Sequence, residues 1–434
     1  MSPATSLLTD HYELTMVEAA LAAGTAHRRS VFELFARRLP AGRRYGLVGG
    51  TGRILEGLAD FRFGSDEIDY LASREVVNEA TLEWLSDFRF SGSITGYAEG
   101  EVYFPGSPLL QVESTFAEAV VLETYLLSVL NFDSAVASAA SRMVASAEGR
   151  PCIEMGSRRT HEEGAVAAAR AAIIAGFAST SNLEAGRRYG LATGGTAAHS
   201  FTLLHDSERE AFQAQVDTLG ADTTLLVDTY DVERGVRTAV DVAGPGLGAV
   251  RIDSGDLVDQ ARWVRRLLDD LGNTDTGIVV TSDLDEYAIA SLRSAPVDTY
   301  GVGTKLVTGS GHPTAGMVYK LVAREGADGG WKDVAKRAPG KGSVGGRKAA
   351  FRRLNERGRA TAELIGVDGS RPPAGVEARD LLVPLVVDGD VQPGFTGVEG
   401  VTRAIARREA SIGELPGSGK QMLAGDPVIP TEYL

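Results

Sequence analysis

The chain has 434 residues, too many for one ordinary hydrophobic core, so two or three domains are expected. Lysine and arginine total 44 against 58 aspartates and glutamates, and the formal net charge of −14 disfavours general binding to nucleic acid or to an anionic membrane. Cys152 is the only cysteine, which excludes an internal disulfide and a thiolate metal cluster. We find no apolar leader or membrane-spanning segment, so we expect a cytoplasmic protein. Because the net charge is negative, any anionic substrate must be bound by local arginines.

An amphipathic helix is expected at residues 6–24, where Asp10 and Glu13 have the spacing of a capping box. Tyr12 lies in the first turn of this helix. Two interpretations of Tyr12 stay open: an aromatic side chain packed at a helix start, which the pattern alone favours, or a ring presented to a ligand.

The following segments predict mixed structure up to residue 147. A strand is expected at 30–35, and the glycines of 49–52 precede a helix without the third glycine or the later acid of a dinucleotide-binding fingerprint. Residues 91–112 predict hairpins. Residues 114–147 predict a long helix that is broken near 131–134.

From residue 151 the chain alternates short apolar segments with helical patterns, which predicts parallel βα units. The strand candidates are 151–155, 174–178, 191–193, 224–227, 249–252, 277–281 and 298–300. The helix candidates between them are 164–175, 208–219, 232–242, 255–271 and 284–294.

Polar side chains follow nearly every strand candidate. In a parallel barrel they would converge on the carboxyl-terminal rim, where such folds carry their chemistry. Ordinary helix N-caps would account for about half of them, but not for the arginines or His199. In chain order, the strand ends carry Arg158 with Arg159, Ser179 to Asn182, Gly194 to Thr196 before His199, Asp228 with Asp231, Asp253 with Asp256, Ser282 with Asp283 and Asp285, and Gly301 to Thr304.

After residue 311 the alternation stops. Strands are expected at 318–322 and 348–354, with a basic loop rich in glycine and proline at 336–343 between them. We expect these segments to complete a second domain and not to extend the barrel.

The arginines and the glycines favour a phosphate-containing ligand. Arg158, Arg159 and Arg251 suit bidentate pairing with a carboxylate or a phosphate, and Gly301 to Thr304 offer backbone N–H groups directly after a strand. The acids at the strand ends could hold Mg²⁺ through water or accept hydrogen bonds from sugar hydroxyls. No metal cage is expected, because the histidines lack the usual spacing.

Two histidines lie at expected helix starts. His161, followed by two glutamates, is interpreted as a helix cap. For His199 two interpretations stay open: a helix N-terminal residue with both nitrogens satisfied, or a neutral imidazole that accepts a phosphoryl group.

Six motifs follow one another in the order seen in the nicotinate phosphoribosyltransferase family, which the chain resembles from residue 7 to about 350: LLTDHYELTM at 7–16, EMGSRR at 154–159, GTAAHSF at 195–201, VRIDSGD at 250–256, GVGT at 301–304 and VYKL at 318–321. The resemblance implies the type II phosphoribosyltransferase fold. That fold is an incomplete seven-stranded α/β barrel, expected at 148–312, beside an α/β sandwich built from both chain ends, expected at 1–147 and 313–434.

The resemblance also implies a role for each matching residue. Tyr12, contributed by the neighbouring subunit of a homodimer, would stack on the nicotinate ring, and Arg158 would lie near the nicotinate carboxylate or the ribose phosphate. Arg251 would contact phosphate, and Asp253 the ribose or the ring side of the site. His199 would be the histidine that ATP phosphorylates. The further substrate contacts would be Met155, Arg159, Ser181, Thr196, Asp228, Asp256, Gly301, Gly303 and Thr304, with Asp228 a weaker candidate for orienting His199.

The implied reaction converts nicotinate and phosphoribosyl diphosphate to nicotinate mononucleotide and diphosphate, with Mg²⁺ and coupled ATP hydrolysis, in NAD salvage.

Met155 departs from the family, whose members commonly have an aromatic residue there. Nicotinamide as the substrate would call for a carboxylate near the ring, whereas residues 179–182 offer hydroxyls and an amide. Quinolinate would need further basic groups. A non-catalytic nucleotide-binding regulator on the same scaffold is the remaining alternative.

Overall fold

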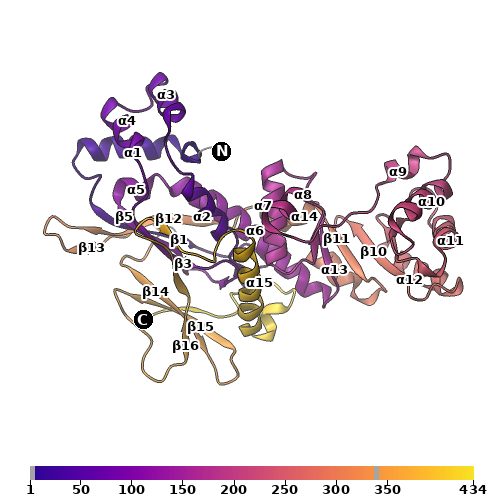
Figure 1. Ribbon diagram of the computed structural model, residues 1–434. Helices are drawn as coiled ribbons and strands as arrows, with labels where there is room; N and C mark the ends of the chain where they lie inside the picture. Colours follow the sequence, from indigo (N-terminus) through magenta and orange to yellow (C-terminus); the bar gives the residue numbers. More distant parts are fainter. Residues whose placement is uncertain (1–4, 337–341) are drawn as a thin grey trace. The chain divides into compact units, whose positions relative to one another are not determined.

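The computed structural model describes residues 5–336 and 342–434. The chain forms two compact units, which Figure 1 shows. Unit 1 comprises Met1–Ser138 with His312–Leu434, and unit 2 comprises Ala139–Gly311. The domain edges expected from the sequence were residues 147 and 312. The basic loop expected at 336–343 lies largely outside the described residues.

Unit 1 is built around an antiparallel seven-stranded sheet in the order β13-β12-β1-β5-β3-β17-β18. Neighbouring strands β1 and β12 come from opposite ends of the chain, so this sheet is made by both ends together. Its strands are β1 (Arg29–Ala36), β3 (Ser93–Tyr97), β5 (Pro108–Thr115), β12 (Met317–Glu325), β13 (Trp331–Asp333), β17 (Leu382–Val387) and β18 (Asp390–Val391).

Two smaller sheets complete the strands of unit 1. A four-stranded sheet has the order β16-β14-β15-β19, and β2 pairs with β4. The strands are β2 (Gly46–Leu47), β4 (Val102–Tyr103), β14 (Lys348–Leu354), β15 (Ala360–Val367), β16 (Ala378–Asp380) and β19 (Thr431–Tyr433). The helical segments of unit 1 are η1 (Ser6–Leu8), α1 (His11–Ala22), α2 (Thr51–Ala59), α3 (Ser65–Ser73), α4 (Glu79–Ser86), α5 (Phe116–Val120), the first part of α6 (Glu123–Ala147), α15 (Gly397–Glu414) and η5 (Gly417–Lys420).

The expected capping box at the start of the chain is wrong. Asp10 is the N-cap residue of α1, but its side chain makes no capping hydrogen bond. The Glu13 carboxylate accepts hydrogen bonds from the Thr9 hydroxyl and from the backbone N–H and the hydroxyl of Thr124, the N–H at 2.9 Å. Glu13 therefore joins α1 to the first turn of α6, and burial raises the pKa of its carboxyl to about 7.

The long helix is not broken where the sequence indicated. It is interrupted between α5 and α6, and α6 is continuous through 131–134. Asn131 accepts a hydrogen bond from the Met317 N–H at 2.8 Å, and the Ser134 hydroxyl bonds the backbone of Gly49, so distant partners satisfy these polar side chains without breaking the helix. By length and composition Phe116–Ala147 could cross a membrane, but 67% of its most apolar window is buried inside the protein, as in a core helix.

Unit 2 has a six-stranded, wholly parallel sheet in the order β7-β6-β11-β10-β9-β8. Its strands are β6 (Cys152–Glu154), β7 (Ser179–Thr180), β8 (Thr224–Leu226), β9 (Ala249–Ile252), β10 (Gly277–Ser282) and β11 (Thr299–Val302). The helical segments between these strands and after the last one are α7 (Glu162–Ile174), α8 (Leu183–Tyr189), α9 (His199–Leu204), α10 (Glu208–Leu219), α11 (Val232–Ala243), η2 (Gly244–Gly246), α12 (Leu257–Asp270), α13 (Glu286–Ser291), η3 (Leu292–Ser294), α14 (Thr304–Val307) and η4 (Gly309–Gly311). The prediction of parallel βα units is confirmed, and Figure 1 shows α10, α11 and α12 grouped beyond β10, on the side where β9 and β8 continue the sheet.

Two of the seven strand candidates differ from the structure. The segment 174–178 is wrong as a strand, because the alanine-rich helix α7 continues to Ile174 and the strand begins only at Ser179. Gly176, with φ of 109°, ends the helical path. The segment 191–193 contributes a single parallel bridge, Thr180 to Thr193, and no named strand.

Candidate active site

The carboxyl ends of the unit 2 strands surround a cavity of about 500 Å³. Parallel strands bring their carboxyl ends to one edge of a sheet, so residues far apart in sequence meet there. The cavity is lined by Met155, Arg158, Arg159, Ala198, His199, Ser200, Arg251, Asp253, Thr281, Ser282, Asp283, Gly301, Gly303 and Thr304. The cavity thus brings together residues of the motifs at 154–159, 195–201, 250–256 and 301–304, as expected from their positions at strand ends.

Arg251 is the strand residue whose charge faces this cavity. Within the described residues its guanidinium donates one hydrogen bond, from Nη1 to the Thr196 hydroxyl at 3.3 Å, and its buried Nε has no partner. Burial lowers the pKa of Arg251, although Asp253 and Asp228 favour its charged form, and the nearby Arg158 lowers that pKa further. Both arginines line the cavity, where one anion could pair with both guanidinium groups.

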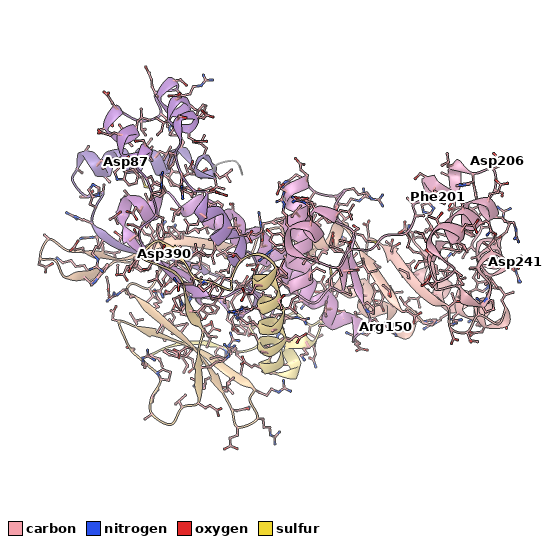
Figure 2. All side chains as sticks on the ribbon, in the orientation of Figure 1. Asp87, Arg150, Phe201, Asp206, Asp241 and Asp390 are labelled. Atoms are coloured by element: carbon pink, nitrogen blue, oxygen red, sulfur yellow. The ribbon has the colours of Figure 1, made fainter. Side chains whose placement is uncertain are left out.

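His199 begins α9 and lies against the end of β8. Its Nδ1 is 3.1 Å from the Thr229 hydroxyl, and its Nε2 is 3.9 Å from Oδ1 of Asp228, whose side chain is 1% exposed. Figure 2 labels Phe201, on the same helix, and Asp206, which follows it. One ring nitrogen of His199 thus lies near a hydroxyl and the other near a buried carboxylate. The His199 side chain is 40% exposed and lines the cavity.

Asp228 is held in place from the next strand. Its Oδ2 accepts hydrogen bonds from the Asp253 N–H and the Ser254 hydroxyl, both at 2.8 Å. Among the described residues, its buried Oδ1 has no hydrogen-bond partner, and this oxygen lies 3.9 Å from Nε2 of His199. Asp228 does not line the cavity, so the structure places it behind His199 and not beside a substrate.

The turn after β11 gives the cavity a narrow wall. Gly301 lies in β11 next to its last residue, Val302, and Gly303 is the N-cap residue of the short helix α14, which begins at Thr304. A Cβ on Gly301 would lie 2.4 Å from Cγ2 of Thr281 and 2.9 Å from Sδ of Met155, so only glycine leaves both lining side chains in place.

Asp253 and Asp256 have different surroundings. The Asp253 carboxylate lines the cavity and accepts a hydrogen bond from the Thr281 hydroxyl. Asp256 lies outside the lining and is the N-cap of α12, where it accepts the Asp259 N–H at 3.2 Å. His161 is likewise a cap, accepting the Gly164 N–H at 3.1 Å, which confirms the interpretation made from the sequence.

Three other candidates are not among the lining residues. Thr196 reaches the site through its contact with Arg251, whereas Ser181 is exposed and its backbone N–H bonds the Glu154 carbonyl at 2.8 Å. Tyr12 belongs to unit 1, where 46% of the residue is exposed; partial burial, Glu123, Glu13 and Asp10 raise the pKa of its phenol to about 12. Its proposed place in a neighbouring subunit's site stays a prediction.

The sequence did not assign five of the lining residues. Ser282 and Asp283 were noted after the strand candidate 277–281 but were given no role, and Thr281 was predicted only as the last residue of that strand. The available signal was the parallel pairing itself, because the end of β10 must lie between the ends of β9 and β11. Ala198 and Ser200 flank His199 and follow it into the cavity.

Comparison with known proteins agrees with these motifs. Residues 7–131 match the nicotinate phosphoribosyltransferase (NAPRTase) N-terminal domain. The chain is 57% identical over 439 residues to nicotinate phosphoribosyltransferase pncB1 of Mycobacterium tuberculosis, covering 99% of this chain and 95% of that protein. It is 38% identical over 362 residues to nicotinate phosphoribosyltransferase of Bacillus subtilis, covering 81% and 74%.

Among solved structures, human nicotinic acid phosphoribosyltransferase superposes with a TM-score of 0.82 at 26% identity, covering 98% of this chain and 97% of that chain. The chain thus shares its fold with the human protein over nearly its full length, and more than half of its residues are identical to those of the Mycobacterium tuberculosis relative. The chain therefore belongs to the nicotinate phosphoribosyltransferase family.

Proposed function

We propose that this protein is a nicotinate phosphoribosyltransferase that converts nicotinate and 5-phosphoribosyl 1-diphosphate to nicotinate mononucleotide and diphosphate, for NAD synthesis by salvage. The observation that carries the proposal is the convergence of Arg158, Arg159 and Arg251 with the Gly301 to Thr304 turn around one cavity. The 57% identity to a relative of that name supports it. The cavity volume of about 500 Å³ lies within the range for sites that enclose small ligands.

The synthetic step needs alignment more than proton transfer. The lone pair of the pyridine nitrogen forms the new bond to C1 of the ribose, and the C1–O bond to diphosphate breaks with its electron pair leaving on diphosphate. Arg158, Arg159 and Arg251 would stabilise the charge that develops on the departing group or on the nicotinate carboxylate. Backbone N–H groups at Gly303 and Thr304 suit the 5-phosphate, and Met155 can pack on the ring through its sulfur.

ATP coupling is proposed to run through His199. An imidazole nitrogen would attack the γ-phosphorus of ATP, forming an N–P bond as ADP leaves, and water would later cleave that bond to release phosphate. The buried Asp228 carboxylate lies 3.9 Å from Nε2, so a small approach of the two side chains would let it accept the Nε2 proton in a hydrogen bond and leave Nδ1 as the nucleophile. Thr229, 3.1 Å from Nδ1, would have to give way to the phosphoryl group.

A magnesium ion carried by the phosphates fits the donors present. Asp253 and Asp283 line the cavity, and a Mg²⁺ bound to a diphosphate needs only one or two protein carboxylates. When bound, the ion would neutralise charge on the diphosphate. The remaining chemistry belongs to the arginines and to the backbone of the glycine turn.

The partners proposed are nicotinate, phosphoribosyl diphosphate and ATP, in a cytoplasmic homodimer with shared sites. The exposed ring of Tyr12 supports a contribution to the site of a neighbouring subunit. The net charge of −14 agrees with a protein that binds neither nucleic acid nor an anionic membrane.

A substrate comparison tests the function. Purified protein is supplied with phosphoribosyl diphosphate, Mg²⁺ and either nicotinate or nicotinamide, with and without ATP, and the mononucleotides are separated by chromatography. We expect nicotinate mononucleotide as the main product and faster synthesis with ATP. Preference for nicotinamide would change the assigned substrate, absence of any mononucleotide would favour a non-catalytic regulator, and indifference to ATP would remove the proposed role of His199.

A further inference from the structure

A buried carboxyl group lies behind the two arginines of the EMGSRR motif and takes no part in the mechanism above. Glu154 is the last residue of β6, and the whole residue is 0% exposed. Its Oε1 accepts a hydrogen bond from the Gly156 N–H, and its Oε2 accepts one from the Thr180 hydroxyl at the end of β7. Neither partner is charged. Burial raises the pKa of the Glu154 carboxyl, and these two hydrogen bonds only partly oppose that effect.

The hydrogen bond to Gly156 determines the path of the loop that carries the arginines. The Met155 N–H bonds the Val302 carbonyl at 2.8 Å, and the Arg159 N–H bonds the Gly156 carbonyl at 2.8 Å. Between these two anchors, Gly156 is held by Glu154. A Cβ on Gly156 would lie 2.3 Å from Cγ1 of Val307, so only glycine fits at this position of the loop.

The hydrogen bond to Thr180 ties the same carboxyl to the neighbouring loop. The Thr180 oxygen accepts the Asn182 N–H at 3.0 Å, and the Asn182 side chain donates from Nδ2 to the Ser157 hydroxyl at 3.0 Å. Oδ1 of Asn182 caps α8 through the Ala185 N–H at 2.8 Å. Hydrogen bonds thus link Glu154, Thr180, Asn182 and Ser157 into a circuit that the backbone from 154 to 157 closes, and this circuit connects the loops after β6 and β7.

This circuit holds like charges together before a ligand arrives. Arg158 and Arg251 both line the cavity, and the positive charge of Arg158 lowers the pKa of Arg251. Arg158 is exposed, so a flexible loop would let it move away from Arg251 and relieve that repulsion. The fixed loop therefore keeps the anion site arranged in the free protein, and a ligand does not have to order it.

We infer that Glu154 is a positioning residue, whose buried carboxyl fixes the loop from Met155 to Arg159 so that Arg158 and Arg159 face the anionic substrate. This inference rests on the proposed role of the arginines in binding phosphoribosyl diphosphate. Glu154 itself lies outside the cavity lining and touches no substrate.

The test compares two substitutions of nearly the same volume. Glu154→Gln keeps one oxygen to accept the Gly156 N–H and gains an N–H that can donate to the Thr180 oxygen, whereas Glu154→Met removes both hydrogen bonds. We expect Glu154→Met to raise the KM for phosphoribosyl diphosphate and the Kd for inorganic diphosphate about ten- to hundredfold. Glu154→Gln should change either constant less than about threefold.

A matched control is available in the same unit. Glu208 is also buried, at 6% exposure, and neither of its carboxylate oxygens has a hydrogen-bond partner within the described residues. Glu208→Met should leave the Kd for diphosphate unchanged. If Glu154→Met does not fold, Thr180→Val removes one hydrogen bond of the circuit and should raise the Kd about threefold or more.

The inference is overturned if folded Glu154→Met or Thr180→Val binds diphosphate as the parent does. It is also overturned if Glu154→Gln loses as much affinity as Glu154→Met, because hydrogen-bond geometry would then not be the cause. Arg158→Met separates the two claims. If Arg158→Met binds diphosphate normally, the proposed role of that arginine fails, and if only Arg158→Met weakens binding, the inference about Glu154 fails alone.

Discussion

Replacing Arg251 by methionine should weaken anion binding while leaving the fold intact. Methionine retains much of the apolar stem and removes the guanidinium. In the free protein that group donates, within the described residues, one hydrogen bond at 3.3 Å, and its buried Nε donates none, so little native stabilisation is lost with it. We expect the free energy of unfolding to change by less than about 1 kcal/mol.

Binding should respond much more strongly. A hydrogen bond to a charged group is worth roughly 1.5–3 kcal/mol, so each bond lost to a phosphate oxygen weakens binding about 10- to 150-fold. Calorimetry with diphosphate gives the Kd, and urea unfolding gives the stability. Arg209→Met is the control, because Arg209 is exposed and pairs with Asp241 on the surface at 2.9 Å. An unchanged Kd for Arg251→Met, or a loss of stability of several kcal/mol, would refute this reasoning.

Three further predictions concern other parts of the molecule. Gly301→Ala should raise the KM for either substrate roughly tenfold or more, because the new Cβ would lie 2.4 Å from Thr281 Cγ2 and displace the cavity wall; a KM within error of the parent in steady-state kinetics would contradict this. His199→Asn should take up no acid-labile phosphoryl group from labelled ATP and should lose stimulation by ATP while retaining slow synthesis, and labelling of that variant would exclude His199 as the acceptor. Burial raises the pKa of Glu13 from 4.5 to about 7, so the contribution of Glu13 to the free energy of unfolding is complete below pH 4.5 and is lost as the pH rises through 7. In Glu13→Gln, the free energy of unfolding in urea should depend less on pH between 4.5 and 7, and a pH dependence equal to that of the parent would contradict this prediction.

Local patterns were sufficient to predict much of unit 2. β9 and α10 begin and end at the expected residues, and α11 ends one residue later than expected, because their apolar spacing and their flanking polar residues agree with one another. The segment 174–178 could not be placed, since a run of alanine and isoleucine suits a buried helix as well as a buried strand. The turn at Gly176, which decides between them, has no distinct signal in that context.

Long-range partners explain most of the other differences. The break expected at 131–134 does not occur, because Asn131 bonds Met317 and Ser134 bonds Gly49, and neither pairing can be read from local sequence. Glu13 has the spacing of a capping box but bonds Thr124 instead. The positions of Arg251, Asp253 and Gly301 at strand ends predicted that they lie around one cavity. The places of Thr281 and Glu154 depend on the register between neighbouring strands, which the sequence does not show.

A crystal structure of the protein with nicotinate mononucleotide and diphosphate tests the central claim most directly. We predict that the 5-phosphate lies at the Gly301 to Thr304 turn, that the pyridine ring lies beside Met155, and that Arg158 and Arg251 contact anionic oxygens of the ligands. Ligands bound away from the carboxyl ends of β6, β9 and β11, or a bound phosphate that touches neither arginine, would contradict the account.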